Sequence, residues 1–429
     1  MSPFDSAQGR STRTHQPGAD ATAHARRAIA ACRRLATLSD EPGHTTRLFL
    51  SNAARAVLDD LNSWMTRVGM AVRIDAAGNL RGVYEGTSAA APRLLIGSHL
   101  DTVPHAGAFD GVLGVVLGVT LVEMLGGRRH PFAIEIVGFS EEEGVRFGVP
   151  FIGSRGLVGT LDAALLQRRD AEGSSVADAM RGFGLDPSHL REARVNDALG
   201  YLEIHIEQGP VLDRLGRPLG VVNAIVGQTR ANVVFIGEAA HAGTTPMNVR
   251  RDALAAAAEW ITSIETSARR VEGLVATVGR IDVEPGAGNV IAGRCRLPVD
   301  IRHGRDDVRR AAAESARRHA IEIATRRGLS VDWNVVLDQP AVAMDGRFVS
   351  ILELAVEQSG VPVQIMPSGA GHDAMILAAR MPAAMLFVRS PGGISHHPAE
   401  SVDEADVAAA LNAALKFLDV LAARRESSS

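Results

Sequence analysis

Apolar positions along the chain recur in two periods, and these periods predict its helices and strands. Residues 51–69 are predicted to form an amphipathic helix, because their apolar positions follow one another at spacings of four, three and four. These positions are Val57, Leu61, Trp64 and Val68. Short apolar runs of strand length follow at 92–99 (PRLLIGSH) and 132–139 (FAIEIVGF), and a mostly apolar helix is expected between them at 111–125. Strand, helix and strand in this order predict a βαβ unit.

A different alternation appears in YLEIHIEQG at 201–209, which predicts a strand with one apolar and one polar face. Leu202, Ile204 and Ile206 would lie on one face, opposite Glu203, His205 and Glu207. Polar stretches follow each of the predicted strands. Open α/β sheets bind ligands at the carboxyl ends of their strands, so we expect a site there.

The pattern changes near Gly227 and changes back after Asp338. Between these points lie three strand-like pieces (RANVVFIGEA, LVATVGRIDV and CRLPVDIR) and two Ala- and Arg-rich helices, at 250–269 and 305–327. We therefore predict an α/β fold with a discontinuous main domain, whose mixed, mostly parallel sheet is flanked by helices, and an inserted α+β domain. The predicted segments are a flexible tail at 1–25, the main domain at 26–226 and 339–429, and the insertion at 227–338.

Composition narrows the partners and the compartment. The 429 residues carry 45 Lys and Arg against 49 Asp and Glu, without long blocks of one sign, which argues against nucleic acid or a membrane surface and favours a small molecule. The longest apolar run, at 111–122, is too short to span a bilayer. Cys32 and Cys295 lie far apart without CxxC spacing, and residues 1–25 have no apolar core of a signal peptide, so we expect a cytoplasmic protein.

The polar stretches combine imidazole with carboxylate. They are GSHLDTVPHAGAFDG at 97–111, SEEEG at 140–144, EIHIEQG at 203–209 and GGISHHPAE at 392–400. Three successive glutamates raise one another's pKa, so SEEEG is either a solvated turn or a group held together by a cation. A lone histidine is more often an ordinary hydrogen-bonded residue, but four such stretches at strand ends favour a pair of divalent transition ions.

Seven ordered motifs between about residue 40 and residue 405 carry a resemblance to a known family. They are GSHLDTV…FDG, EEEG.RF…GS, HIEQG, GQ.R…HAGTTPM..R.DAL, N.I…DIR, SGAGHDA and GISH.P.E. The chain closely resembles the dinuclear metallohydrolases of the aminoacylase and carboxypeptidase superfamily. Within it, the chain resembles the branch that cleaves ureido groups, which includes N-carbamoyl-L-amino acid hydrolases and allantoate amidohydrolases.

The resemblance implies a centre with two divalent ions, either Zn, Mn or Co. Asp110 would bridge them, with His99 and His205 completing one site and Glu142 and His396 the other. It also implies that Glu141 is the catalytic base, that Glu143 points away, and that Asp101 accepts the second N–H of His99. His105 and His397 match no ligand position, although sequence leaves open which of His396 and His397 faces inward.

Substrate recognition is implied for the insertion, which would be a dimerising lid in a homodimer. His241 would reach the site of the partner subunit and polarise the scissile carbonyl, and Asn289 and Arg302 would hold a substrate carboxylate. The remaining residues implied for the pocket are Gln208, Arg230 and Gly371.

The expected function is hydrolysis of a linear ureido group on a small carboxylate, with allantoate as first substrate and N-carbamoyl-L-amino acids second. The alternatives are an acylamino acid hydrolase or dipeptidase, and a catalytically silent metal-binding relative. HIEQG favours the ureido branch, because other branches more often place a carboxylate at the position of His205. A retained base argues against a silent relative, since binding alone needs none.

Overall fold

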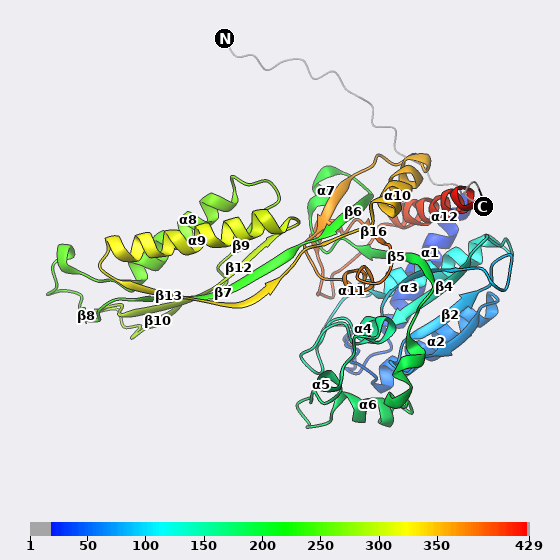
Figure 1. The fold of residues 1–429 in the computed structure, drawn as a ribbon, viewed down its shortest axis with the longest axis horizontal. Coiled ribbons are helices and arrows are strands. Elements are labelled where there is room, and N and C mark those ends of the chain that lie inside the picture. Colours follow the sequence, from blue (N-terminus) through cyan, green and yellow to red (C-terminus); the bar gives the residue numbers. More distant parts are fainter. Residues whose placement is uncertain (1–18, 427–429) are drawn as a thin grey trace, which may run out of the picture. The chain divides into compact units, whose positions relative to one another are not determined.

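The structure, a computed structural model, describes residues 19–426 and divides into two compact units. The first comprises the chain through Val221, Asp345–Ile365 and the chain from His372 onward. The second comprises Val222–Met344 and Met366–Gly371, and is therefore wider than the insertion expected at 227–338. The chain passes from the first unit to the second within β6 (Leu219–Ile225) (Figure 1).

A mixed sheet forms the centre of the first unit. Across the sheet, its strands are β1 (Ala71–Ile74), β2 (Leu80–Tyr84), β4 (Ala133–Phe139), β3 (Arg93–His99), β5 (Ala198–Ile206) and β16 (Ala383–Val388), followed by β6. β3 runs parallel to β4 and β5, and β16 runs parallel to β5, whereas β1 and β2 are antiparallel to their neighbours. This arrangement confirms the predicted mixed, mostly parallel sheet.

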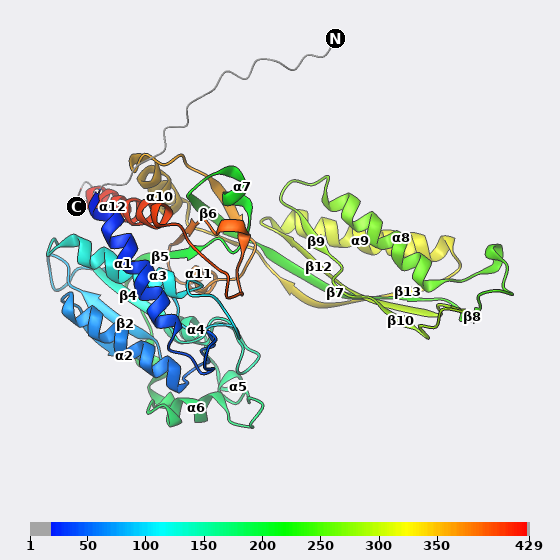
Figure 2. The same ribbon diagram turned by 180° about the vertical axis from the view of Figure 1, so that it is seen from behind.

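Long helices pack on this sheet and on one another. They are α1 (Ala19–Ala36), α2 (Asn52–Arg67), α3 (Val112–Leu125), α10 (Gly346–Gln358) and α12 (Glu404–Glu426). α3 is buried on almost every side because it lies against β3, β4 and β5 and is covered by α1 and α12 (Figure 2). Gly114 makes this close packing possible, since a Cβ atom there would lie 2.1 Å from the carbonyl oxygen of Ile204.

Several short elements connect the long ones. They are α4 (Ile152–Val158), α5 (Ala163–Leu166), α6 (Val176–Gly182), η1 (Pro187–Ala193), α7 (Val211–Leu215), α11 (Asp373–Leu377) and η3 (Pro391–Gly393). Residues 1–18 of the expected flexible tail lie outside the described part of the chain. Residues 19–25 of that tail belong to helix α1, and its Ala21, Ala25 and Ala28 are buried.

The second unit is an antiparallel sheet with two helices, as predicted for an α+β domain. Its strands, in spatial order, are β10 (Asp282–Glu284), β12 (Arg294–His303), β7 (Gly227–Ile236) and β13 (Ser330–Gln339), with β9 (Val275–Thr277) beside β12. The small pairs are β8 (Ala240–His241) with β11 (Val290–Ile291), and β14 (Val342–Ala343) and β15 (Ile365–Ser368), each with β6. The two helices are α8 (Ala253–Ala268) and α9 (Asp306–Arg326), and η2 (Met247–Val249) is a short 3-10 turn.

One face of the long sheet supplies the core of this unit. Cys295, Leu297, Val299 and Ile301 of β12 are buried in a cluster with Trp260 of α8. The alternate positions of β12 lie on the other face. The predicted strand LVATVGRIDV is two short strands, and β13 was not predicted, because its alternating residues are mostly exposed or half-buried.

Within residues 19–426, none of the helices combines the length and apolar character needed to cross a membrane.

Candidate metal centre

The histidines and carboxylates of the predicted site gather in the first unit, in the loops that follow parallel strands. The loops follow β3, β4, β5 and β16. Because parallel strands end at the same edge of a sheet, side chains from segments far apart in sequence meet there. The predicted polar face of β5 is buried rather than exposed, since Glu203 and His205 are 0% and 1% exposed.

His99, Asp110 and His205 form the first group of ligands. Their ligand atoms lie within 4.8 Å of one another, and all three residues are buried. Nε2 of His205 is 3.2 Å from Oδ1 of Asp110 and 3.4 Å from Nε2 of His99. Nδ1 of His99 lies 3.0 Å from the backbone carbonyl oxygen of Asp101. Nδ1 of His205 lies 2.9 Å from that of Ile206. An Nδ1–H that donates to a carbonyl leaves Nε2 as the acceptor atom, which can bind a cation. Nε2 of His205 accepts the backbone N–H of Gly111 at 3.2 Å.

Asp110, Glu143 and His396 form the second group. Nε2 of His396 lies 3.1 Å from Oδ2 of Asp110 and 3.5 Å from Oε1 of Glu143. Asp110 thus belongs to both groups, as a bridging ligand must. Glu143, which was expected to point away, faces His396. Glu142 also lies in a group of possible ligands, so its assignment as the metal ligand stays a prediction.

The position of the glutamates follows from how the chain leaves β4. The carboxylate of Asp101 accepts the backbone N–H groups of Glu142 and Glu143, at 2.9 and 3.0 Å. These bonds hold the turn against the loop that carries His99, which brings Glu143 toward His396. Oδ1 of Asp101 also lies 3.4 Å from Nδ1 of His99, farther than the backbone carbonyl of Asp101 at 3.0 Å, so its expected role as acceptor for His99 stays a prediction.

Glu141 and Glu142 differ sharply in their surroundings. Glu142 forms a third group with His99 and Glu143, with ligand atoms within 4.8 Å. Glu141, the expected base, belongs to none of the three groups found in the described chain. It is 1% exposed, and neither of its carboxyl oxygens accepts a hydrogen bond from the described residues. Burial raises the pKa of Glu141 well above its usual range, and Asp101 and Glu143 raise it further.

The electrostatics of the centre favour positive charge between the carboxylates. Burial lowers the pKa of His99, but Asp101 and Asp110 raise it, and it stands well above the usual value. Burial raises the pKa of Glu143 to about 7. Nε2 of Gln208 lies 3.1 Å from both carboxylate oxygens of Asp110 and 3.3 Å from Nε2 of His396. The side-chain N–H groups of Gln208 thus lie where the oxygens of Asp110 and the Nε2 atom of His396 converge. Carboxylate oxygens and imidazole nitrogens together are ligands that suit divalent transition ions.

The two adjacent histidines of GGISHHPAE face different ways. His396 turns its Nε2 to Asp110, whereas Nδ1 of His397 accepts the backbone N–H of Ala399 at 3.1 Å. His105 also lies outside the groups of ligands, because its Nε2 faces Glu41 at 2.7 Å.

Sequence reasoning assigned no role to two buried residues beside the ligands. The ring of His372, 1% exposed, lies 4.5 Å from that of His205, and burial holds its pKa well below the usual value. Glu400 accepts backbone N–H groups from the loop of Asp110. The signal for Glu400 was present, since it closes the motif that contains His396.

The remaining expected site residues, apart from Gln208, lie in the second unit. Asn289 and His241 are neighbours, because the carbonyl of Asn289 accepts the N–H of Ala242 at 2.9 Å. Arg302 contacts both oxygens of Asp300 at 3.0 Å and donates to the carbonyl of Gly369 at 2.9 Å. Gly371 ends this unit.

A groove of about 640 Å³ contains part of this second set. Arg230, Asp300, Arg302 and Gly369 line it together with apolar residues such as Pro298. Nε of Arg230 is 3.0 Å from Oδ2 of Asp300. Two guanidinium charges thus face one carboxylate, which leaves a positive charge in the groove.

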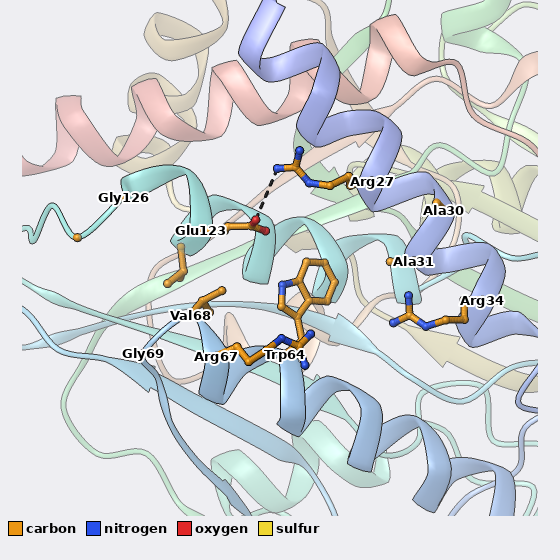
Figure 3. A pocket seen from close by; sticks show the side chains of 12 residues that line it. Arg27, Ala30, Ala31, Arg34, Trp64, Arg67, Val68, Gly69, Glu123 and Gly126 are labelled. Atoms are coloured by element: carbon orange, nitrogen blue, oxygen red, sulfur yellow. Dashed lines mark ion pairs between the residues drawn. The ribbon is translucent and has the colours of Figure 1, made fainter.

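Another pocket of the first unit, between α1, α2 and α3, lacks the chemistry of the metal centre. Figure 3 shows its arginines and Trp64, with Glu123 as the carboxylate among the lining residues. Arg27 bridges to Glu123 at 3.5 Å, and Arg34 to Asp60 at 2.6 Å, so these arginines join the helices.

The chain matches the family model described as peptidase family M20/M25/M40 over residues 95–419, and it belongs to this family. It is 42% identical over 372 residues to an N-carbamoyl-L-amino acid amidohydrolase of Geobacillus stearothermophilus, covering 85% of this chain and 90% of that one. It is 39% identical over 426 residues to a probable allantoate deiminase of Oryza sativa subsp. japonica, covering 90% and 86%.

A solved structure places the chain within the family. A hydantoinase/carbamoylase family amidase from Burkholderia ambifaria superimposes with a TM-score of 0.86 and 34% identity, covering 92% of this chain and 96% of that one. The chain therefore belongs to the hydantoinase/carbamoylase branch, which confirms the resemblance drawn from the motifs.

Proposed function

We propose that this chain is a dinuclear metal-dependent amidohydrolase that cleaves a ureido C–N bond of a small carboxylate. The observation that carries the proposal is the sharing of Asp110 between two groups of ligands, one with His99 and His205 and one with Glu143 and His396. The names of the relatives, an N-carbamoyl-L-amino acid amidohydrolase and an allantoate deiminase, support a ureido substrate.

Two divalent cations held by these residues would supply an activated water and would polarise the ureido carbonyl. Glu142, beside His99 and Glu143, is placed to take a proton from the attacking water and to give it to the leaving nitrogen. Water adds to the carbonyl carbon, the C–N bond breaks, and the carbamate decomposes to ammonia and carbon dioxide. In this proposal Glu142 is the base and Glu143 the ligand, one residue later than the sequence suggested.

Recognition of the substrate is proposed for the second unit. The positive charge that Arg230 and Arg302 leave beside Asp300 suits a substrate carboxylate. Asn289 would assist Arg302, and Gly371 and Gln208 would complete the pocket. His241 would polarise the carbonyl in the site of a second copy, which makes the working enzyme a homodimer.

Release of ammonia tests the proposed reaction. The chelated protein receives Zn, Mn or Co in turn and is assayed with allantoate, with N-carbamoyl-L-amino acids, and with an N-acyl amino acid and a dipeptide as controls. We expect ammonia from at least one ureido substrate and no cleavage of the controls. Cleavage of a control without ammonia from either ureido substrate would favour the acylamino acid hydrolase. Metal binding without any turnover would favour a silent relative.

A further inference from the structure

Glu400 lies between the two loops that carry the shared ligand and the last histidine of the metal centre. The residue is 5% exposed. Its Oε1 accepts the backbone N–H groups of Phe109 and Asp110, at 2.8 and 3.0 Å. Oε1 therefore holds the main chain at the residue whose carboxylate belongs to both groups of ligands.

The approach of the two loops is too close for any side chain at Gly107. A Cβ atom there would lie 2.3 Å from Cβ of Glu400 and 2.6 Å from its Oε1. Because real Cβ atoms do not come so close, a larger residue at this position must push Glu400 away from the loop. A second link is weaker: Oγ of Ser395 lies 3.4 Å from Oε2 of Glu400 and 3.5 Å from Oδ2 of Asp110.

Glu400 also closes the turn that directly follows His396. His396 has a φ of 54°, in the left-handed region that residues other than glycine seldom adopt. The backbone N–H of Glu400 donates to the carbonyl of His397 at 3.0 Å. The turn is thus held at its far end by a residue whose side chain is bonded to the loop of Asp110.

We propose that Glu400 is a positioning residue that fixes Asp110 relative to His396, and that it does so as a hydrogen-bond acceptor rather than as a negative charge. The inference rests on the proposed metal centre but not on the ureido substrate. A glutamine keeps the acceptor oxygen and the length of the side chain, whereas an alanine leaves the two N–H groups of Phe109 and Asp110 without their partner.

The experiment measures metal affinity rather than turnover. Chelator competition with Zn and Mn is applied to wild type, Glu400→Gln, Glu400→Ala and Gly107→Ala, and the melting temperature of each metal-free variant checks its fold. Gly182→Ala is the matched control, because a Cβ atom there meets nothing within 4 Å. Loss of residues that hold metal ligands typically lowers metal affinity by about 10 to 100-fold.

We expect that loss for Glu400→Ala and Gly107→Ala, and a change of less than about threefold for Glu400→Gln and Gly182→Ala. The double variant Gly107→Ala/Glu400→Ala should bind metal no more weakly than the weaker-binding of the two single variants, because both substitutions disturb the same contact. If Glu400→Gln loses as much affinity as Glu400→Ala, the charge matters and the proposal fails. It also fails if Glu400→Ala binds like wild type. Should Glu400→Ala not fold, equal affinity of Gly107→Ala and Gly182→Ala overturns it.

Discussion

The imidazole of His396 faces the carboxylate of Glu143, with Nε2 and Oε1 3.5 Å apart. The proposed register of the three glutamates rests on this pair, because a residue that faces His396 and approaches Asp110 is placed to bind the same cation. In the proposed register the neighbouring Glu142, which lies beside His99 and Glu143, is the base.

The first prediction separates these roles. Glu142→Gln should keep two metal ions per chain and lose turnover by a factor of about 10² to 10⁴, the usual contribution of a general base. Glu143→Gln should lower metal occupancy, because the second group loses a charged ligand. Metal analysis and the rate of ammonia release give both values.

Glu141→Gln provides the contrast, since Glu141 lies outside the three groups of ligands. We expect it to retain both metals and most of the turnover. If Glu141→Gln is the inactive variant with full metal content, the register suggested by the sequence is right and ours is wrong.

Removal of the metal should lower the stability of the first unit. A ligand that binds only the folded state stabilises it by about 2.7 kcal/mol at a concentration 100 times its Kd. We therefore expect chelation to lower the melting temperature of the wild type and added metal to restore it. Asp110→Asn, which weakens both groups at once, should show little further change on chelation. An unchanged wild-type transition would argue against two ions at this centre.

Arg302→Lys should lower kcat/KM by at least about tenfold, or roughly 1.4 kcal/mol, because lysine keeps the charge but loses the planar fork. Arg296→Lys is the matched control, from the same strand and the same face of β12. The assignment predicts that the loss disappears with a substrate analogue that lacks the carboxylate. An equal loss with that analogue would assign Arg302 to the structure of the groove, where it already binds Asp300.

His241 is predicted to act in the site of a partner chain. Glu142→Gln and His241→Ala homodimers should each be nearly inactive. After unfolding, equal mixing and refolding, half of the dimers should be hybrids that hold one intact site, which restores roughly a quarter of wild-type activity. Native mass spectrometry confirms the hybrids. Their presence without any gain over the two parents would show that His241 serves its own chain or none.

The sequence predicted most of the elements around the site, because β3, β4 and β5 are apolar runs bounded by polar residues. It failed for α1, whose buried face consists largely of alanines such as Ala25 and Ala28, so the apolar contrast that marks a helix is weak. The short elements between residues 152 and 193 were missed for a similar reason, since none is longer than seven residues.

The motifs named the candidate ligands, but nothing in them decides among the three glutamates. Glu141, Glu142 and Glu143 are chemically identical, so nothing local distinguishes them. What separates them is a contact distant in sequence, the carboxylate of Asp101 on the N–H groups of Glu142 and Glu143. Likewise, the contact of His396 with Asp110 and the bond from Ala399 to the ring of His397 show which of the two adjacent histidines turns away.

The central place of β16 in the sheet has a consequence for the growing chain. β16 pairs with β5, although the two strands are far apart in sequence, and the segment that follows β16 carries His396 and Glu400. A nascent chain emerging from the ribosome holds His99, Asp110, Glu143 and His205 long before these residues are made. The second group of ligands therefore cannot close, and the sheet cannot finish, until translation has passed the whole second unit. Catalytic competence arrives only at the end of synthesis.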